Sequence, residues 1–282
     1  MQVKLGTDGK VSVFNGGSGP VDIIGDVMGF YAPGGATFLS TLPTRFTDRQ
    51  IVGGQPFVAV FQPPAFKGRV YRAVAQNVTI DQPAGDGWVR AYPSLEPAAG
   101  SSNLNFLAGQ TVANAVLVGT SSQPLNGEPG RAVAFSIAPS VTSARLIIDD
   151  RGIFIDPDGT DTGKFVPITP CRVADTRVTP AKRLSAGTPV TFAIAGACDL
   201  PPAANIDSVA INVTAVNPTA TAFVRVWGGG DPQPAVSTLN VKAGQIVANH
   251  AIVYSGASGN INALVNAGTT DLIIDVSGYY ST

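Results

Sequence analysis

The chain has 282 residues, enough for about two domains of roughly 100–150 residues each. Its formal net charge is −1 and it has no basic block, which argues against nucleic acid or an anionic membrane as the main partner. No apolar run approaches the ~18 residues of a membrane-spanning helix, so we expect no membrane insertion.

Residues 1–31 read as the C-terminal part of an incomplete repeat unit. Residues 10–14 alternate like a strand, and residues 15–19 form a turn cluster of Asn, Gly and Ser. A few strands alone would leave unpaired edges and too little core. We therefore expect this segment to belong to a longer polypeptide or to complete a partner's sheet. Its strands should contact a sheet that is not formed by residues 38–154.

Two complete units follow, at residues 38–155 and 165–282. Strand-like runs recur every 8–15 residues with Gly, Pro or Asn between them, and no amphipathic helix of ten or more residues occurs. Residues 73–79 match 208–214, and residues 102–114 match 237–249, which indicates duplication. We predict an all-β fold of tandem antiparallel β-sandwich domains, of the jelly-roll or immunoglobulin-like kind.

One motif ends each unit. Residues 23–31, 146–154 and 272–280 each contain apolar β-branched residues, one Asp, a Gly three positions later and then bulky apolar residues. The aspartates are Asp26, Asp149 and Asp275, separated by 123 and 126 positions. That spacing is one domain length, so the motif closes a repeating unit.

The third unit resembles a repeat found in secreted and cell-surface bacterial proteins and in some actinobacteriophage tail proteins. The resemblance rests on the opening Pro-Cys-Arg-x-x-Asp-Thr-Arg at 170–177, on Ala-Gly-Gln-x-x-Ala-Asn at 243–249, and on the closing Asp-Val-x-Gly-Tyr at 275–279. The second unit departs from it at Thr44 and Gln50, and residues 1–31 match only the last third. The resemblance implies an extracellular, non-enzymatic structural or adhesive module, and it supplies no ligand.

Cys171 and Cys198 are the two cysteines of the chain, 27 positions apart in one unit. We expect them to form a disulfide, which fits an exported protein; the alternative is two buried thiols. A metal site is disfavoured because the chain has one His and no Cys-x-x-Cys.

Charged residues recur at the start and end of each unit. An Asp inside an apolar strand is costly unless it is paired. We expect Arg172 to pair with Asp175 or Asp275, tying the first strand to the last, with a cost of about 3–5 kcal/mol if one member of a buried pair is removed. A carboxylate dyad for glycoside hydrolysis is the disfavoured alternative. The residues of this predicted ion-pair set are Arg45, Asp48, Asp149, Arg172, Asp175 and Asp275.

Two weaker patterns suggest ligands. Asp156, Asp158 and Asp161 have the alternate spacing of a calcium loop, but the Glu of an EF-hand is missing, so we favour a polar turn between domains over a weak calcium site. Aromatic side chains of sandwiches more often belong to the core or its rim than to a sugar-stacking surface. The residues considered for carbohydrate contact are Trp88, Tyr92 and Trp227.

The sequence predicts a structural protein and no enzyme. No Gly-x-Ser-x-Gly motif occurs, and the second unit has Ala115 where the third has His250, so no shared catalytic base exists. We expect an adhesive or structural repeat of a surface filament, sheath or fibre, without a cofactor, whose partners are itself or neighbouring units through β-sheet contacts. The alternatives are a phage tail or virion protein, and a carbohydrate-binding accessory to a cell-wall enzyme that contacts a cell-surface glycan.

Overall fold

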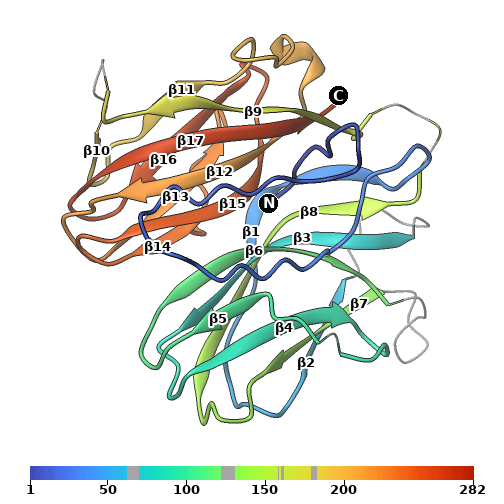
Figure 1. The fold of residues 1–282 in the computed structure, drawn as a ribbon, viewed down its shortest axis with the longest axis vertical. Helices are drawn as coiled ribbons and strands as arrows, with labels where there is room; N and C mark the ends of the chain where they lie inside the picture. Colours follow the sequence, from blue (N-terminus) through green and yellow to red (C-terminus); the bar gives the residue numbers. More distant parts are fainter. Residues whose placement is uncertain (62–69, 99, 122–130, 158, 160–161, 179–182) are drawn as a thin grey trace.

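The computed structural model describes the chain except for residues 62–69, 99, 122–130, 158, 160–161 and 179–182. The described residues form two β-sandwiches and no α-helix, so the predicted all-β, antiparallel sandwich fold is confirmed (Figure 1). The second sandwich includes a short 3-10 turn, Ala203–Asn205.

The first sandwich contains eight strands in two sheets. One sheet has the order β1-β8-β3-β6 and the other β2-β7-β4-β5. The strands are β1 (Thr37–Ile51), β2 (Phe57–Phe61), β3 (Tyr71–Asp81), β4 (Gly87–Pro93), β5 (Leu104–Phe106), β6 (Val112–Gly119), β7 (Arg131–Ile137) and β8 (Ala144–Ile155).

The second sandwich repeats this arrangement. Its sheets have the orders β10-β17-β12-β15, with β9 also paired to β17, and β11-β16-β13-β14. The strands are β9 (Phe165–Asp175), β10 (Leu184–Ser185), β11 (Val190–Ala193), β12 (Ser208–Val216), β13 (Ala222–Gly228), β14 (Leu239–Val241), β15 (Ile246–Tyr254), β16 (Asn260–Val265) and β17 (Thr269–Tyr280).

Each sandwich has its own core, built from the inward-facing residues of both sheets. In the first, Val78 and Ile148 pack with Phe135, and all three are fully buried. In the second, Val213 and Ile274 occupy the places of Val78 and Ile148. Apolar and polar residues alternate along strands that are rich in β-branched side chains, and this explains why one face of each sheet is buried in the core.

The closing motif forms the central strands β8 and β17. Its Gly allows an aromatic ring of the first strand to lie directly on the backbone. A methyl group on Gly152 would overlap the ring of Phe38, and one on Gly278 would overlap the ring of Phe165. The motif therefore marks the place where first and last strands meet.

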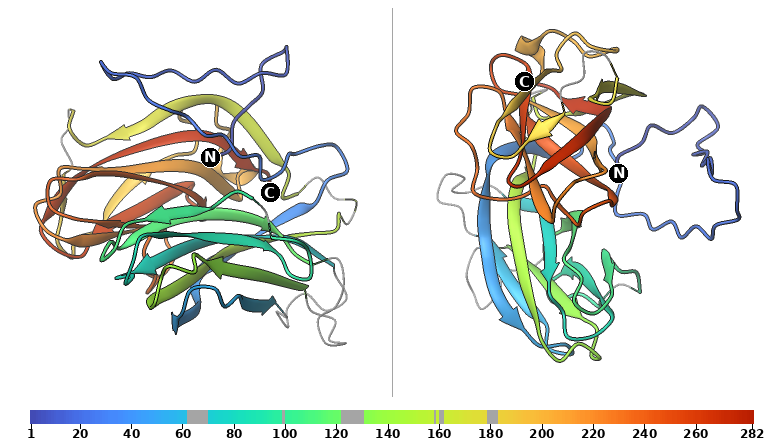
Figure 2. Two further views of the ribbon diagram at one scale, coloured as in Figure 1. Left: turned by 60° about the horizontal axis from the view of Figure 1, so that its bottom comes forward. Right: turned by 90° about the vertical axis from the view of Figure 1, so that its left-hand side faces the viewer.

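Residues 1–36 belong to no sheet. The strand expected at residues 10–14 is absent, because no neighbouring strand is present to accept and donate its backbone hydrogen bonds. The segment instead loops away from the two sandwiches and returns to them at Tyr31 (Figure 2).

Candidate functional site: the interface between the two sandwiches

The predicted ion-pair residues come together at the first and last strands. Arg172 on β9 donates to Asp275 on β17 through Nε (2.8 Å) and Nη2 (3.3 Å), and its Nη1 lies 3.5 Å from Asp175. In the first sandwich Arg45 on β1 pairs with Asp149 and with Asp48 at 2.8 Å.

These pairs are less buried than the sequence suggested. The Arg172 side chain is 49% exposed and that of Asp275 is 29% exposed. A solvated pair of this kind contributes about 0.2–1 kcal/mol, so the expected cost of 3–5 kcal/mol for a buried pair does not apply to Arg172. Asp149 is the exception: it is fully buried, and burial raises the pKa of its carboxyl although Arg45 opposes that shift.

Two other carboxylates of the set, those of Asp175 and Asp48, are held ionised by arginines. Arg177 is the main cause of a pKa of about 2 for Asp175, and a hydrogen bond from Arg145 lowers the pKa of Asp48. Their oxygens are occupied by guanidinium groups, which leaves them poorly suited to acid–base chemistry.

Cys171 and Cys198 are joined by a disulfide with a Cα–Cα distance of 6.4 Å. It ties β9 to the loop before the 3-10 turn in the second sandwich. Disulfides persist in oxidising compartments, so this bond fits an extracellular protein. Within the described ranges, no helical segment has the length and apolar character needed to cross a bilayer.

The residues considered for ligands are not brought together. Asp158 and Asp161 lie outside the described residues, and Asp156 pairs with Arg72. In the part of the chain that the structure describes, no three acidic, His or Cys side chains converge as metal ligands would.

The three aromatic residues occupy separate places. Trp88 and Tyr92 lie half-buried on β4, where the guanidinium of Arg90 covers the Trp88 ring at 3.9 Å. Trp227 lies in the other sandwich, is 3% exposed, and donates from Nε1 to the carbonyl of Asp231. A shared sugar-stacking platform on these residues is therefore not formed.

Polar residues matched between the units hold turns and neighbouring strands. The side-chain oxygen of Gln110 accepts from the amide of Leu107, as that of Gln245 does from Lys242. Asn114 donates to the carbonyl of Asn103 at 2.6 Å, and Asn249 donates to the carbonyl of the equivalent Thr238 at 2.9 Å. These bonds agree with an architectural role.

Asn249 also bonds across to the first sandwich. Its Oδ1 accepts from the Ala115 amide (2.9 Å), and its Nδ2 donates to Oδ1 of Asn77 (2.8 Å). Asn77 and Arg151 in turn donate to the carbonyl of Ser237, each at 3.0 Å. The interface thus contains a buried hydrogen-bond network from β3, β6 and β8 to β15 and the loop before β14.

Aromatic rings pack beside this network. Phe38 and Phe154 of the first sandwich meet Tyr280 of the second, with Phe38 and Tyr280 ring centroids 4.4 Å apart. Ala75 and Ile252 complete the buried cluster. Apolar rings packed beside a buried hydrogen-bond network are typical of a fixed interface.

The interface joins different surfaces of the two repeats. If the two surfaces were the same, Asn212, the equivalent of Asn77, would bond to the first sandwich near Ser102 and Asn114. Instead Asn212 lies 3.4 Å from Thr214 of its own strand, and Asn114 is exposed. Such a head-to-tail contact either closes into a ring or continues into a filament.

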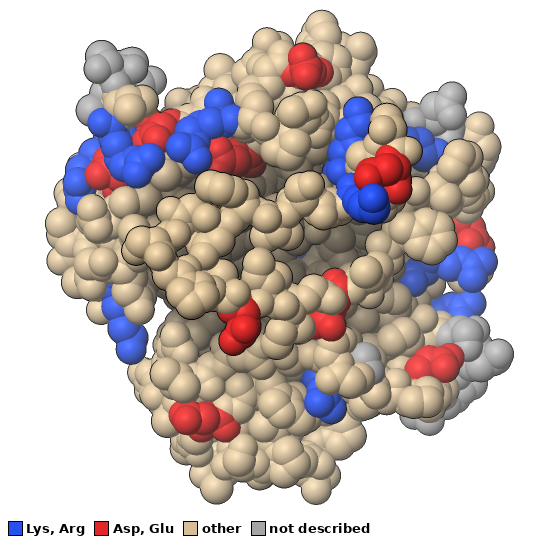
Figure 3. Space-filling model, in the orientation of Figure 1, with Lys and Arg blue, Asp and Glu red and all other residues tan. Residues whose placement is uncertain are grey.

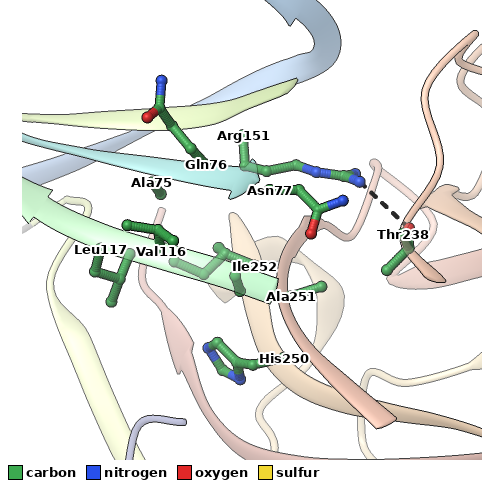
Figure 4. Close-up of a pocket in the computed structure, with 11 residues that line it drawn as sticks. Ala75, Gln76, Asn77, Val116, Leu117, Arg151, Thr238, His250, Ala251 and Ile252 are labelled. Atoms are coloured by element: carbon green, nitrogen blue, oxygen red, sulfur yellow. Dashed lines mark hydrogen bonds between the residues drawn. The ribbon is translucent and has the colours of Figure 1, made fainter. Parts of the chain in front are cut away.

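A cavity of about 10 Å³, the size of one water molecule, lies within the interface beside His250, Asn77 and Arg151 (Figure 4). Burial lowers the pKa of His250 to about 3 and that of Arg151 to about 10. The cavity is too small for a substrate. A larger groove of about 340 Å³ nearby contains Arg45, Asp48 and Arg145, whose charges are paired with one another.

Sequence reasoning missed these interface residues. The available signal was the difference between copies: Asp150 and Arg151 stand where the later copy has Val276 and Ser277. When polar residues replace apolar or small ones in only one of two matched strands, that strand is expected to make a polar contact that the other strand does not make.

Comparison with known proteins does not assign a function. No protein-family model matches the chain, and no curated protein matches it. Among solved structures, the chain is similar to that of the Macrobrachium rosenbergii nodavirus (10% identity, 96% of both chains covered, TM-score 0.24). It is also similar to the CBM22-1-CBM22-2 tandem domain of Paenibacillus barcinonensis Xyn10C (12% identity, 91% of this chain and 100% of that one, TM-score 0.21). These TM-scores are too low to carry an argument.

Proposed function

We propose that the chain is a non-enzymatic structural or adhesive module of an extracellular assembly such as a surface filament, sheath or fibre. The observation that best supports the proposal is the head-to-tail interface, in which one surface of the first sandwich contacts a non-equivalent surface of the second. Its partners are further copies of the same repeat. A phage tail or virion would use the module in the same structural way.

Two further observations support this role. The polar residues matched between the units bond to backbone groups or to one another, as expected of a scaffold. The disulfide is suited to an oxidising, extracellular location.

Immunogold labelling tests the proposal directly. Antibodies raised against the purified protein should label a fibre, sheath or particle outside the cell in the source organism or its phage. Non-reducing mass spectrometry of the same material should find Cys171 linked to Cys198. Label confined to the cytosol, with both cysteines reduced, would contradict the proposal.

Carbohydrate binding is a weaker candidate that rests on Trp88 and Tyr92 alone. A glycan array run with the wild-type protein and a Trp88→Ala variant separates it from the structural role. Binding that is lost in the variant would favour the accessory-module function.

A further inference from the structure

Residues 1–31 have the closing motif of a sandwich but no sandwich around them. Their apolar side chains are largely exposed, and Figure 2 shows the segment extending away from both sandwiches. Five of these side chains are between 87% and 91% exposed: Met1, Phe14, Ile24, Val27 and Phe30. A contiguous exposed apolar segment indicates a missing partner.

We propose that the two sandwiches are two members of a closed ring of three. The third member is a sandwich of the same repeat that uses residues 1–31 as its last strands and sits against both visible sandwiches. This inference deepens the proposed function by naming the partner, and the geometry is the same whether its first strands precede Met1 or come from a neighbouring chain.

One turn of the N-terminal segment has a counterpart before the last strands of the second sandwich. The amide of Gly9 donates to the Gly6 carbonyl at 2.9 Å, as the amide of Gly259 donates to the Gly256 carbonyl at 3.1 Å. Gly9 and Gly259 have φ values of 75° and 66°. The turn between β15 and β16 therefore has its counterpart at residues 6–9.

The closing aromatic residues of all three units meet at one point. Tyr31, Phe154 and Tyr280 occupy the same position of the motif. Their ring centroids are 6.3 Å apart in every pair, which is an equilateral triangle. Three equivalent residues at the corners of such a triangle define a pseudo-three-fold axis.

The aromatic contacts around this axis run in one direction. Phe38, on the first strand of the first sandwich, packs on Tyr280 of the second at 4.4 Å. Its equivalent Phe165, in the second sandwich, packs on Tyr31 of the N-terminal unit at 4.6 Å. The first sandwich thus leads to the second, and the second leads to the unit that ends at Tyr31.

A polar contact joins the third pair of units, the N-terminal unit and the first sandwich. Arg151 of the first sandwich donates to the hydroxyl of Thr238 of the second at 3.3 Å. Met28 is the equivalent of Arg151, and its sulfur lies 3.8 Å from the amide of Asn103, the equivalent of Thr238. The N-terminal unit therefore contacts the first sandwich as the first contacts the second.

The exposure of equivalent asparagines shows which surfaces the third sandwich would contact. Asn77 and Asn249 are 3% and 2% exposed where the two sandwiches meet. Their equivalents are more open: Asn212 is half-buried and Asn114 is exposed. Figure 3 shows one face of the molecule, which is hollowed near its centre. The third sandwich would cover both open surfaces.

A chain that completes the third sandwich tests the proposal. Ala251 aligns with Met1, so residues 165–251 are fused directly ahead of Gln2 in place of Met1. We expect a monomer by light scattering, a compact three-lobed envelope by small-angle X-ray scattering, and amide exchange at residues 10–31 slowed at least 100-fold relative to the 282-residue protein. Exchange as fast as in that protein, or a linear envelope, would overturn the ring.

Gly29→Val supplies the matched control. No atom lies within 4 Å of a Cβ placed on Gly29, so the substitution should leave the 282-residue protein unchanged. In the completed sandwich, Gly29 occupies the position of Gly152 and Gly278, where a Cβ overlaps an aromatic ring. The substitution should abolish the protection in the fusion; retained protection would count against the ring.

A cross-link decides the question if the fusion does not fold. Met28→Cys and Asn103→Cys, introduced together into the 282-residue protein, should form a disulfide in nearly all molecules on mild oxidation. Met28→Cys paired with the exposed Leu95→Cys should not. Failure of the first pair would overturn the ring and would leave the proposed extracellular structural role to its own labelling test.

Discussion

His250 is buried between the two sandwiches, where burial lowers its pKa to about 3. The unfolded chain, with a His pKa near 6.5, binds more protons than the folded protein between these values. The stability that depends on neutral His250 is therefore complete above about pH 6.5 and is lost as the pH falls towards 3.

We predict that this loss disappears in His250→Ala, which places the residue of the equivalent position, Ala115, at this site. The free energy of unfolding of both proteins can be measured with urea at pH 7, 6, 5 and 4. Below pH 6 it should fall more steeply with decreasing pH in the wild type than in the variant, by up to about 1.4 kcal/mol per pH unit. Equal slopes in both proteins would show that His250 is solvated.

Asp150 has the opposite effect. Burial raises the pKa of its carboxyl to about 6, above the usual value of 3.8, while Gln76 donates to it at 2.7 Å. The folded protein holds the extra proton between about pH 4 and 6, so this contribution to stability is present below pH 4 and is lost as the pH rises through 6.

Asp150→Asn should therefore be more stable than the wild type at pH 7, by about 1–3 kcal/mol, and equally stable near pH 4. The amide oxygen still accepts the bond from Gln76, so packing changes little. Thermal melts of both proteins at the two pH values provide the measurement, and a variant that is less stable at pH 7 would contradict the predicted burial.

The closing strands are the elements on which each sandwich depends. Gly278→Ala should destabilise the protein by about 2–4 kcal/mol because the methyl group collides with Phe165. Gly29→Ala, at the same motif position in the N-terminal segment, should cost almost nothing. Chemical denaturation of both variants checks this, and equal effects would mean that the glycine serves no close contact.

The disulfide belongs to one sandwich only. Replacing both Cys171 and Cys198 by Ala should lower the free energy of unfolding by about 3–4 kcal/mol, the value for a loop of this length in the chain-entropy model. The loss should fall on the second sandwich, because the first folds without cysteines. Amide exchange that quickens equally in both sandwiches would contradict this assignment.

Sequence patterns predicted most of the elements but not their assembly. Period-two alternation and matched motifs were enough for β3 and β12, which contain the matched residues 73–79 and 208–214, because local burial in a sandwich determines those patterns. The partial exposure of Arg172 and the burial of Trp227 could not be read from one chain, because both depend on which strand covers them. The strand at residues 10–14 was predicted from alternation, but a strand needs a neighbour to pair with.

At the scale of the whole molecule, the head-to-tail interface is the feature that the sequence did not reveal. Asn114 and Asn249 carry the same motif, yet only Asn249 bonds across to the other repeat. Identical residues in two copies acquire different roles when a heterologous contact uses a different surface of each.

Asn249→Ala should therefore weaken the protein more than Asn114→Ala, by about 1–3 kcal/mol, because it leaves Asn77 and the Ala115 amide without their buried partner. It should also separate the unfolding of the two sandwiches into two calorimetric transitions. Equal losses in both variants, with a single transition in each, would show that the network does not join the repeats.

The distance between the two sandwiches tests the fixed interface most directly. Spin labels at Leu107→Cys in the first and Ile246→Cys in the second, both at exposed positions, should give one narrow distance distribution by pulsed dipolar spectroscopy. The same labels in an Asn249→Ala background should give a broader one. A broad or bimodal distribution in the otherwise unmodified protein would contradict a fixed head-to-tail contact between the repeats.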